Sequence, residues 1–139
     1  MILSAQQLFS DDQAITATAV STNVIDLGIP GTPFGGNQLK QDIGKGTPIP
    51  LLIQVTEDFN TLTSVTVTAE VSAAAAMTSP RVLLSETILL ADLKAGKQTH
   101  VQVVPKDADL RYMAIRYTVT GTAPTTGKFT SGISMGNQD

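Results

Sequence analysis

The sequence of 139 residues contains no cysteine, and His100 is its only histidine. Without cysteine, the chain has neither a disulfide framework nor a thiolate metal site. A single histidine excludes multi-histidine metal sites, and His100 lies in a predicted strand, where alternation points it toward solvent or a neighbouring strand. These absences remove most of the usual metal sites and histidine-activated nucleophiles.

Aromatic and charged residues are also scarce. There is no tryptophan, aromatic residues make up 4% of the chain, and charged residues make up 15%, against the roughly 25% of a typical soluble protein. The formal net charge is −3, and only nine lysines and arginines are spread along the chain. A nucleic-acid surface needs clustered basic residues and a sugar platform needs exposed aromatic rings, so neither partner is expected.

Residues that favour extended backbone are abundant, with 19 threonines and 11 valines. Their branched Cβ atoms suit a pleated chain better than a helix. The clearest alternation runs from Ser64 to Ser72 and predicts a buried face of valines with Ala69 and a wet face of hydroxyl residues with Glu70. A second apolar face is predicted from Met113 to Val119. The predicted strands are 14–20, 23–27, 49–55, 64–72, 81–84, 88–90, 98–104, 111–120 and 128–135.

These eight or nine short strands, separated by turn signals about every ten residues, predict an all-β fold. We expect an antiparallel β sandwich of the jelly-roll type, in which the last two strands form a hairpin through residues 121–127. The chain length suits one domain covering residues 1–139. Residues 1–13 are predicted to be an N-terminal arm, with residues 4–13 either a short helix or extended, and residues 14–135 to be the sandwich.

The longest predicted connection is residues 28–48, which hold six glycines and three prolines. Connections of this length inside a compact domain usually serve a function or are disordered. The start of the chain lacks the basic region and long apolar run of a secretion signal, and no apolar run is long enough to span a membrane. We therefore expect a soluble product with no membrane partner.

A search for catalytic and metal-binding motifs gives only weak matches. Residues 121–128 resemble a phosphate-binding loop, but the spacing of the glycines is one residue too long and Phe129 replaces the metal-binding hydroxyl. Acidic residues occur in pairs in predicted turns, where calcium or a glycosidase mechanism could use them but where they also cap backbone amides. We predict that the protein is not an enzyme and has no cofactor or metal. The acidic pairs are Asp11 with Asp12, Glu57 with Asp58, and Asp107 with Asp109.

Both ends of the chain resemble the small cement, or decoration, proteins of tailed-phage capsids. The matching runs are MILSAQQLFSDDQAITATAVSTNVIDLG at residues 1–28 and LRYMAIRYTVTGTAPTTGKFTSGI at residues 110–133, and the middle, including ADLKAGK at residues 91–97, is similar more loosely. The resemblance covers most of the domain through structural rather than catalytic residues. The loop 28–48 is longer than the connection expected there.

This resemblance implies a jelly-roll-like sandwich that forms a homodimer or homotrimer on the outer surface of an icosahedral capsid. It also implies that the protein bridges neighbouring subunits of the major capsid protein and stabilises the shell against internal genome pressure. The virion would be its location after synthesis in the host cytoplasm.

Seven apolar residues of the arm and the long loop are the candidate partner interface. Leu8 and Phe9 are equally suited to closing one end of the sandwich. An alternative function is a receptor- or glycan-binding accessory domain of a phage particle, which predicts an exposed aromatic or acidic cleft. A small β-sandwich enzyme is a third and weaker alternative. The candidate interface residues are Ile2, Leu3, Leu8, Phe9, Phe34, Leu39 and Ile43.

Overall fold

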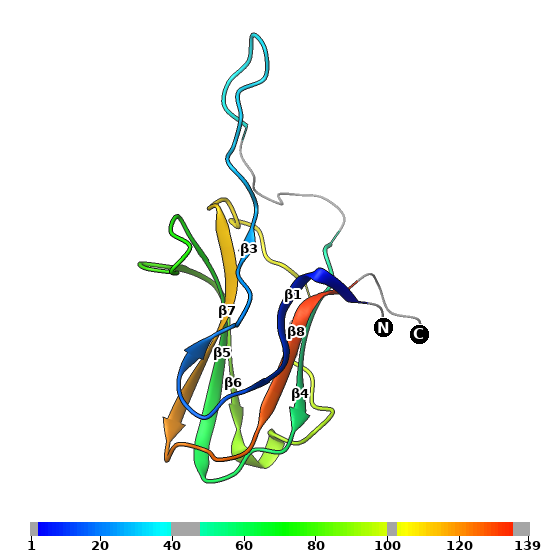
Figure 1. Ribbon diagram of the computed structural model, residues 1–139, viewed down its shortest axis with the longest axis vertical. Coiled ribbons are helices and arrows are strands. Elements are labelled where there is room, and N and C mark those ends of the chain that lie inside the picture. Colours follow the sequence, from blue (N-terminus) through cyan, green and yellow to red (C-terminus); the bar gives the residue numbers. More distant parts are fainter. Residues whose placement is uncertain (1–2, 40–47, 100–102, 135–139) are drawn as a thin grey trace.

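The computed structural model describes residues 3–39, 48–99 and 103–134, which form two antiparallel sheets packed face to face (Figure 1). In these ranges the only helix is the 3-10 turn η1 (Leu90–Asp92), and none has the length and apolar character needed to cross a membrane. The eight strands are β1 (Leu3–Ala14), β2 (Ala19–Val20), β3 (Ile25–Asp26), β4 (Leu51–Glu57), β5 (Leu62–Ser72), β6 (Arg81–Leu89), β7 (Tyr112–Gly121) and β8 (Lys128–Ser134).

The order of the strands is that of a jelly roll. One sheet has the order β1-β8-β4, and the other has β2-β7-β5-β6 with β3 also beside β7. The free side of β4 is bonded to a later segment, because Val55 N–H donates to the Lys97 carbonyl and Thr99 N–H donates to the Ile53 carbonyl. β1 pairs with β8, β2 and β3 pair with β7, and β5 pairs with β6. Early strands therefore pair with late ones, as in one long hairpin rolled into two sheets. The predicted jelly-roll sandwich is confirmed.

Alternating side chains explain why the two sheets bury each other. In β5 the valines at 65, 67 and 71 have no exposed surface, and in β7 the same is true of Ile115 and Tyr117. Strands with one apolar face are stable only when that face is covered, and here each sheet covers the other. The buried faces predicted for residues 64–72 and 113–119 are thus correct.

Tyr117 spans the space between the two sheets. Its ring stacks on Phe129 of β8 with centroids 4.7 Å apart. Its hydroxyl is hydrogen-bonded to Ser10 at 2.9 Å and to Ser131 at 2.8 Å, which belong to β1 and β8 of the opposite sheet. Burial raises the pKa of the Tyr117 phenol to about 12, against the smaller lowering effect of the two hydrogen bonds. The hydroxyl therefore stays protonated and gives the sandwich core a satisfied polar link.

The predicted N-terminal arm is the first strand of the sandwich. Residues 3–13 lie in β1, which pairs with β8 from Leu3 opposite Ser134 to Ala14 opposite Lys128. Phe9 and Ser10 of this strand are buried. The segment is extended rather than helical because it pairs along β8, with irregularities in register, and this pairing places Phe9 in the core.

Two further sequence predictions are wrong. Residues 14–20 are not one strand, because the chain bends at residues 16–18 and passes from one sheet to the other. Residues 121–127 do not close a hairpin, because β7 and β8 belong to different sheets. The Asn60 side chain holds this crossing in place by accepting hydrogen bonds from the backbone N–H groups of Thr125 and Thr126.

Replacing Gly127 with alanine is expected to destabilise the fold by about 3 kcal/mol or more, because the new methyl group would overlap the buried Phe59 ring. The backbone there also has a φ of 129°, which disfavours a side chain. Gly31→Ala is the control, since a methyl group there meets nothing within 4 Å. Urea denaturation measures both, and equal stabilities of the two variants would contradict this packing.

Candidate protein-binding end of the sandwich

The two ends of the sandwich differ in what their connections expose. One end, called the hairpin end here, carries the connections 73–80 and 104–111 and the described parts, 27–39 and 48–50, of the connection between β3 and β4. Five of the six large hydrophobic side chains that are exposed in the described chain belong to this end, and only Leu89 lies at the other. The five are Ile29, Phe34, Leu39, Val82 and Val103.

The opposite end is closed by its own side chains. Besides the Asn60 contacts, the Asp58 carboxylate accepts a hydrogen bond from Ala95 N–H at 2.7 Å, and the Thr126 hydroxyl donates to the Asp58 carbonyl at 3.0 Å. Lys128 lies between Asp12 and Glu57, at 3.6 and 3.2 Å. The closed end is thus held together by hydrogen bonds and ion pairs among its own residues.

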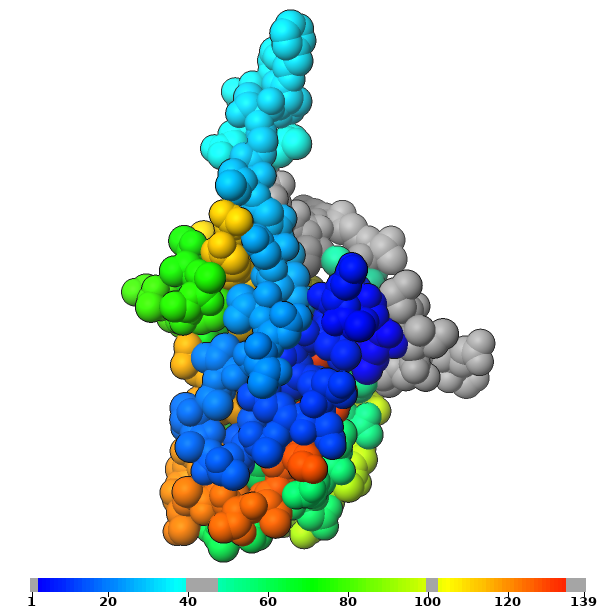
Figure 2. All heavy atoms as spheres, viewed as in Figure 1, coloured from blue at the N-terminus to red at the C-terminus, as the bar shows by residue number. Residues whose placement is uncertain are grey.

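A narrow hairpin projects from the sandwich after β3. Residues 28–39 extend away from the body in Figure 1, and Figure 2 shows them as a slender column clear of the sandwich. Leu39 N–H donates to the Gly31 carbonyl at 2.9 Å, and Gly36 N–H donates to the Pro33 carbonyl at 2.9 Å to form the turn. Gly35 supplies the positive φ of 70° that this turn needs. Phe34 is therefore held at the tip, fully exposed.

The base of this hairpin is clamped to β7 by an ion pair. Arg111 donates from Nε and Nη2 to the two carboxylate oxygens of Asp26, each at 2.9 Å. Gly28 N–H donates to Asp26 Oδ1 at 2.8 Å, and Leu27 N–H donates to the Arg111 carbonyl at 2.7 Å. The hydrogen bonds from Arg111 and then from Gly28 lower the pKa of Asp26, and Asp26 raises the pKa of Arg111. The exit direction of the hairpin is thus fixed by four hydrogen bonds.

An apolar cavity of about 170 Å³ lies beside the same base. Its wall comes from both sheets, and its partly buried members pack on the core but are not covered by it. Leu27 and Ile49 in this wall flank the hairpin connection on its two sides. The cavity is lined by Gln7, Ile25, Leu27, Ile49, Val104, Met113 and Ile133.

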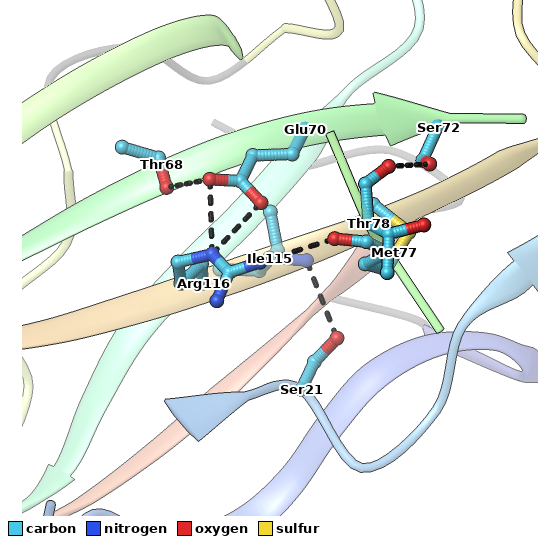
Figure 3. A network of polar contacts seen from close by, with 8 residues as sticks. All are labelled: Ser21, Thr68, Glu70, Ser72, Met77, Thr78, Ile115 and Arg116. Carbon is cyan, nitrogen blue, oxygen red and sulfur yellow. Dashed lines mark hydrogen bonds and ion pairs between the residues drawn. The ribbon is translucent and has the colours of Figure 1, made fainter. Parts of the chain in front are cut away.

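A buried ion pair fastens the connection 73–80 to the outer face of the larger sheet (Figure 3). Arg116 Nε lies 3.1 and 3.0 Å from the two carboxylate oxygens of Glu70, whose side chain is 5% exposed. Thr68 donates to the same carboxylate at 3.0 Å, and Arg116 Nη2 donates to the Met77 carbonyl at 3.4 Å. The Ser72 hydroxyl donates to the Thr78 carbonyl at 2.7 Å. Glu70 and Ser72 are therefore buried, against the prediction that they face solvent.

The edge strand β6 is poorly suited to pairing with another chain. Its register against β5 shifts after Ala69 pairs with Leu84, because Glu70 then pairs with Val82 and Leu83 is extra. Glu86 pairs with the buried Val67, so it lies on the core-facing side of this edge. Bulges and inward-facing charges are features that protect sheet edges from association. Addition of a strand at β6 is therefore disfavoured.

The structure separates the seven predicted interface residues into three groups. Ile2 and Ile43 lie outside the described residues. Phe9 is wholly buried in the core, while Leu3 and Leu8 are half-buried in β1. Only Phe34 and Leu39 are exposed together, and they share the projecting hairpin.

Sequence reasoning missed Ile29 and the cavity. Ile29 is 73% exposed and lies on the hairpin between Gly28 and Pro30, a setting that could have singled it out in the same way as Phe34. The cavity residues carried no local signal, because they come from strands and connections spread along the whole chain. Three exposed apolar side chains and one apolar cavity thus make up the candidate site.

The acidic pairs considered for metal binding have protein partners. Thr56 donates to Asp12 at 2.6 Å, Asp58 caps Ala95, and Asp109 pairs with Arg81. Across residues 3–39, 48–99 and 103–134, no three histidine, cysteine or carboxylate side chains gather in a way that could hold a metal ion. The segment 121–128 that resembled a phosphate loop is the crossing between the two sheets.

The fold and the hairpin end together define a jelly-roll sandwich with an exposed apolar projection. Comparison with known proteins adds the family. The Bbp16 family model matches residues 9–133, and the chain belongs to this family of phage proteins. No curated protein matches the chain.

Glu70→Ala is expected to lower the free energy of unfolding by about 2 kcal/mol or more, because it leaves Arg116 without its carboxylate in a mostly buried position. Asp109→Ala is the matched control, since its ion pair with Arg81 is far more exposed and should contribute less than about 1 kcal/mol. Urea denaturation compares the two, and limited proteolysis should show faster cleavage within residues 73–79 only for Glu70→Ala. Equal losses in both variants would contradict the role assigned to the buried pair.

The ion pair between Asp26 and Arg111 at the hairpin base should make the stability of the fold depend on pH in the acidic range. The pKa of Asp26 in the folded protein lies below its usual value of 3.8, so its contribution is present above that value and is lost as the pH falls through the folded pKa. Asp26→Asn should therefore be less stable than the wild type near pH 7 and should match it at low pH. Thermal unfolding from pH 2 to 7 tests this, with the exposed Asp92→Asn as control; a difference independent of pH would refute it.

Proposed function

We propose that the protein is a structural virion protein that binds the outer surface of an icosahedral phage capsid, bridges neighbouring major capsid protein subunits and stabilises the shell against internal genome pressure. Membership of a phage protein family supports a role in the phage particle. The resemblance of residues 1–28 and 110–133 to cement proteins supports the specific role.

The observation that carries the proposal is the unequal distribution of exposed apolar surface between the two ends. A phenylalanine at the tip of a clamped hairpin is fully exposed and makes no packing contact with the core that the structure describes. Aromatic anchors of this kind supply much of the binding energy in protein interfaces. Clamping the base also reduces the conformational entropy lost when the hairpin binds.

Bridging explains how small contacts can add strength to a shell. Once one contact with the capsid has formed, a second contact to a neighbouring subunit becomes intramolecular and benefits from a high effective concentration. The contacts must then break together before the two capsid subunits separate. An acidic protein without clustered basic residues is compatible with a site outside the shell, away from the packaged genome.

Co-sedimentation of the purified protein with mature phage shells and, separately, with unassembled capsid protein tests this function. We expect saturable binding to shells at a fixed copy number and little binding to free subunits, because only the shell presents neighbouring subunits together. Phe34→Ala should lower occupancy at limiting concentration by about tenfold or more. Leu89→Ala is the matched control, since Leu89 is exposed at the opposite end. Binding to neither preparation would refute the proposal and favour the glycan-binding alternative.

A further inference from the structure

We propose that the apolar cavity beside the hairpin base is a binding site for one small uncharged molecule, of the class of a single aromatic ring or a short alkyl chain, and that its occupancy stabilises the closed sandwich. The site is separate from the exposed hairpin residues assigned to capsid binding. The proposal goes beyond the proposed function and does not depend on it.

The wall of the cavity has no charge and little polarity. Six of its seven residues are apolar, and the seventh, Gln7, is exposed, so it lies on the open side. Throughout the described residues, every buried side-chain nitrogen and oxygen has a hydrogen-bond partner. The cavity therefore offers no unpaired buried side chain to a water molecule, which needs roughly two to four polar partners. Apolar atoms gain more from entering such a space than water does.

The volume of the cavity limits the size of the ligand. The cavity measures about 170 Å³, and an apolar cavity of roughly 150 Å³ accommodates a benzene ring. A nucleotide is too large for this space, and a sugar or a charged head group carries polar groups for which the wall has no partner. The chemistry that fits is an uncharged ring, or an alkyl chain with about the same six carbons as benzene.

The wall joins the two sheets. Gln7 and Ile133 belong to β1 and β8 of one sheet, and Ile25 and Met113 belong to β3 and β7 of the other, where they are paired in register. These side chains surround one space only while the sandwich is closed. A ligand in the cavity therefore binds the folded protein and not the unfolded chain, and by mass action it raises the stability of the fold.

The same wall contains the anchor of the hairpin. Leu27 follows the clamp residue Asp26, and its N–H donates to the Arg111 carbonyl at 2.7 Å. A ligand that packs on the Leu27 side chain therefore holds the backbone at this hydrogen bond in place. Exchange of the Leu27 amide hydrogen should slow when the cavity is filled, because local opening of the hairpin base then also costs the contacts with the ligand.

Titration of the purified full-length protein with benzene, followed by methyl resonances, tests the proposal. The methyl group of Met113 in the cavity wall should shift in a saturable way, while those of Ile88, buried in β6 near the opposite end, should not. Benzene should also raise the unfolding temperature by about 3 °C or more and slow exchange of the Leu27 amide by about threefold or more. Benzoate, which has the same ring and a carboxylate, is the control probe and should do none of these.

Two variants that fill the cavity from different sides test its position. Leu27→Trp and Ile49→Phe should abolish the shift of Met113 by benzene, because a larger side chain occupies the space. Leu89→Trp is the matched control and should respond as the wild type does, because it makes the same change at an exposed position of the opposite end. The methyl resonances of Ile88 report whether each variant is folded, and the second filling variant covers a failure of the first to fold.

The proposal is overturned if benzene gives no saturable shift of Met113 up to its limit of solubility, if benzoate binds equally well, or if the folded filling variants still respond to benzene. The stabilising role is overturned if Met113 shifts while the unfolding temperature and the exchange of Leu27 do not change. Co-sedimentation with shells is a separate measurement. If benzene binds as described but the protein does not bind shells, the cavity site stands and only the capsid function fails.

Discussion

The contact of Tyr117 with the opposite sheet is the interaction on which the rest of the structure depends. It joins the central strand β7 to both β1 and β8 through a stacked ring and two hydrogen bonds. β7 in turn carries β2 on its outer side together with β3, and Asp26 at the end of β3 is clamped by Arg111 immediately before β7. The position of the projecting hairpin is therefore set by a strand that is fixed in the centre of the core.

Local patterns in the sequence were enough to predict the fold class and several faces. Strict alternation in residues 64–72 identified the buried valines, because a pleated strand places every second side chain on the same face. The errors arose where distant residues decide the outcome. The burial of Glu70 depends on Arg116, a partner in another strand, and the crossing at 121–127 depends on Asn60. Neither partner can be recognised from neighbouring residues.

The residues of the candidate site also divide into those that the local sequence predicts and those whose position depends on distant residues. Phe34 and Leu39 could be predicted because large apolar residues among glycines and prolines have few local partners. Phe9, by contrast, was a candidate interface residue of the expected arm but is buried, since β1 pairs with β8 at the far end of the sequence. The cavity could not be predicted at all, because its walls meet only after the two sheets have closed.

The position of β8 sets the time at which this protein becomes complete. β8 is the middle strand of its sheet, between β1 and β4, yet it is made after both of them. While residues 128–134 are still inside the ribosome, β1 and β4 have no strand to join them and Tyr117 has no Phe129 to stack on. Pairing Leu3 with Ser134 also closes a loop over nearly the whole described chain, which makes folding slow compared with a fold of local contacts. The sheet of β1, β8 and β4 can therefore assemble only after residues 128–134 have left the ribosome, and the two sheets cannot close on each other before that point.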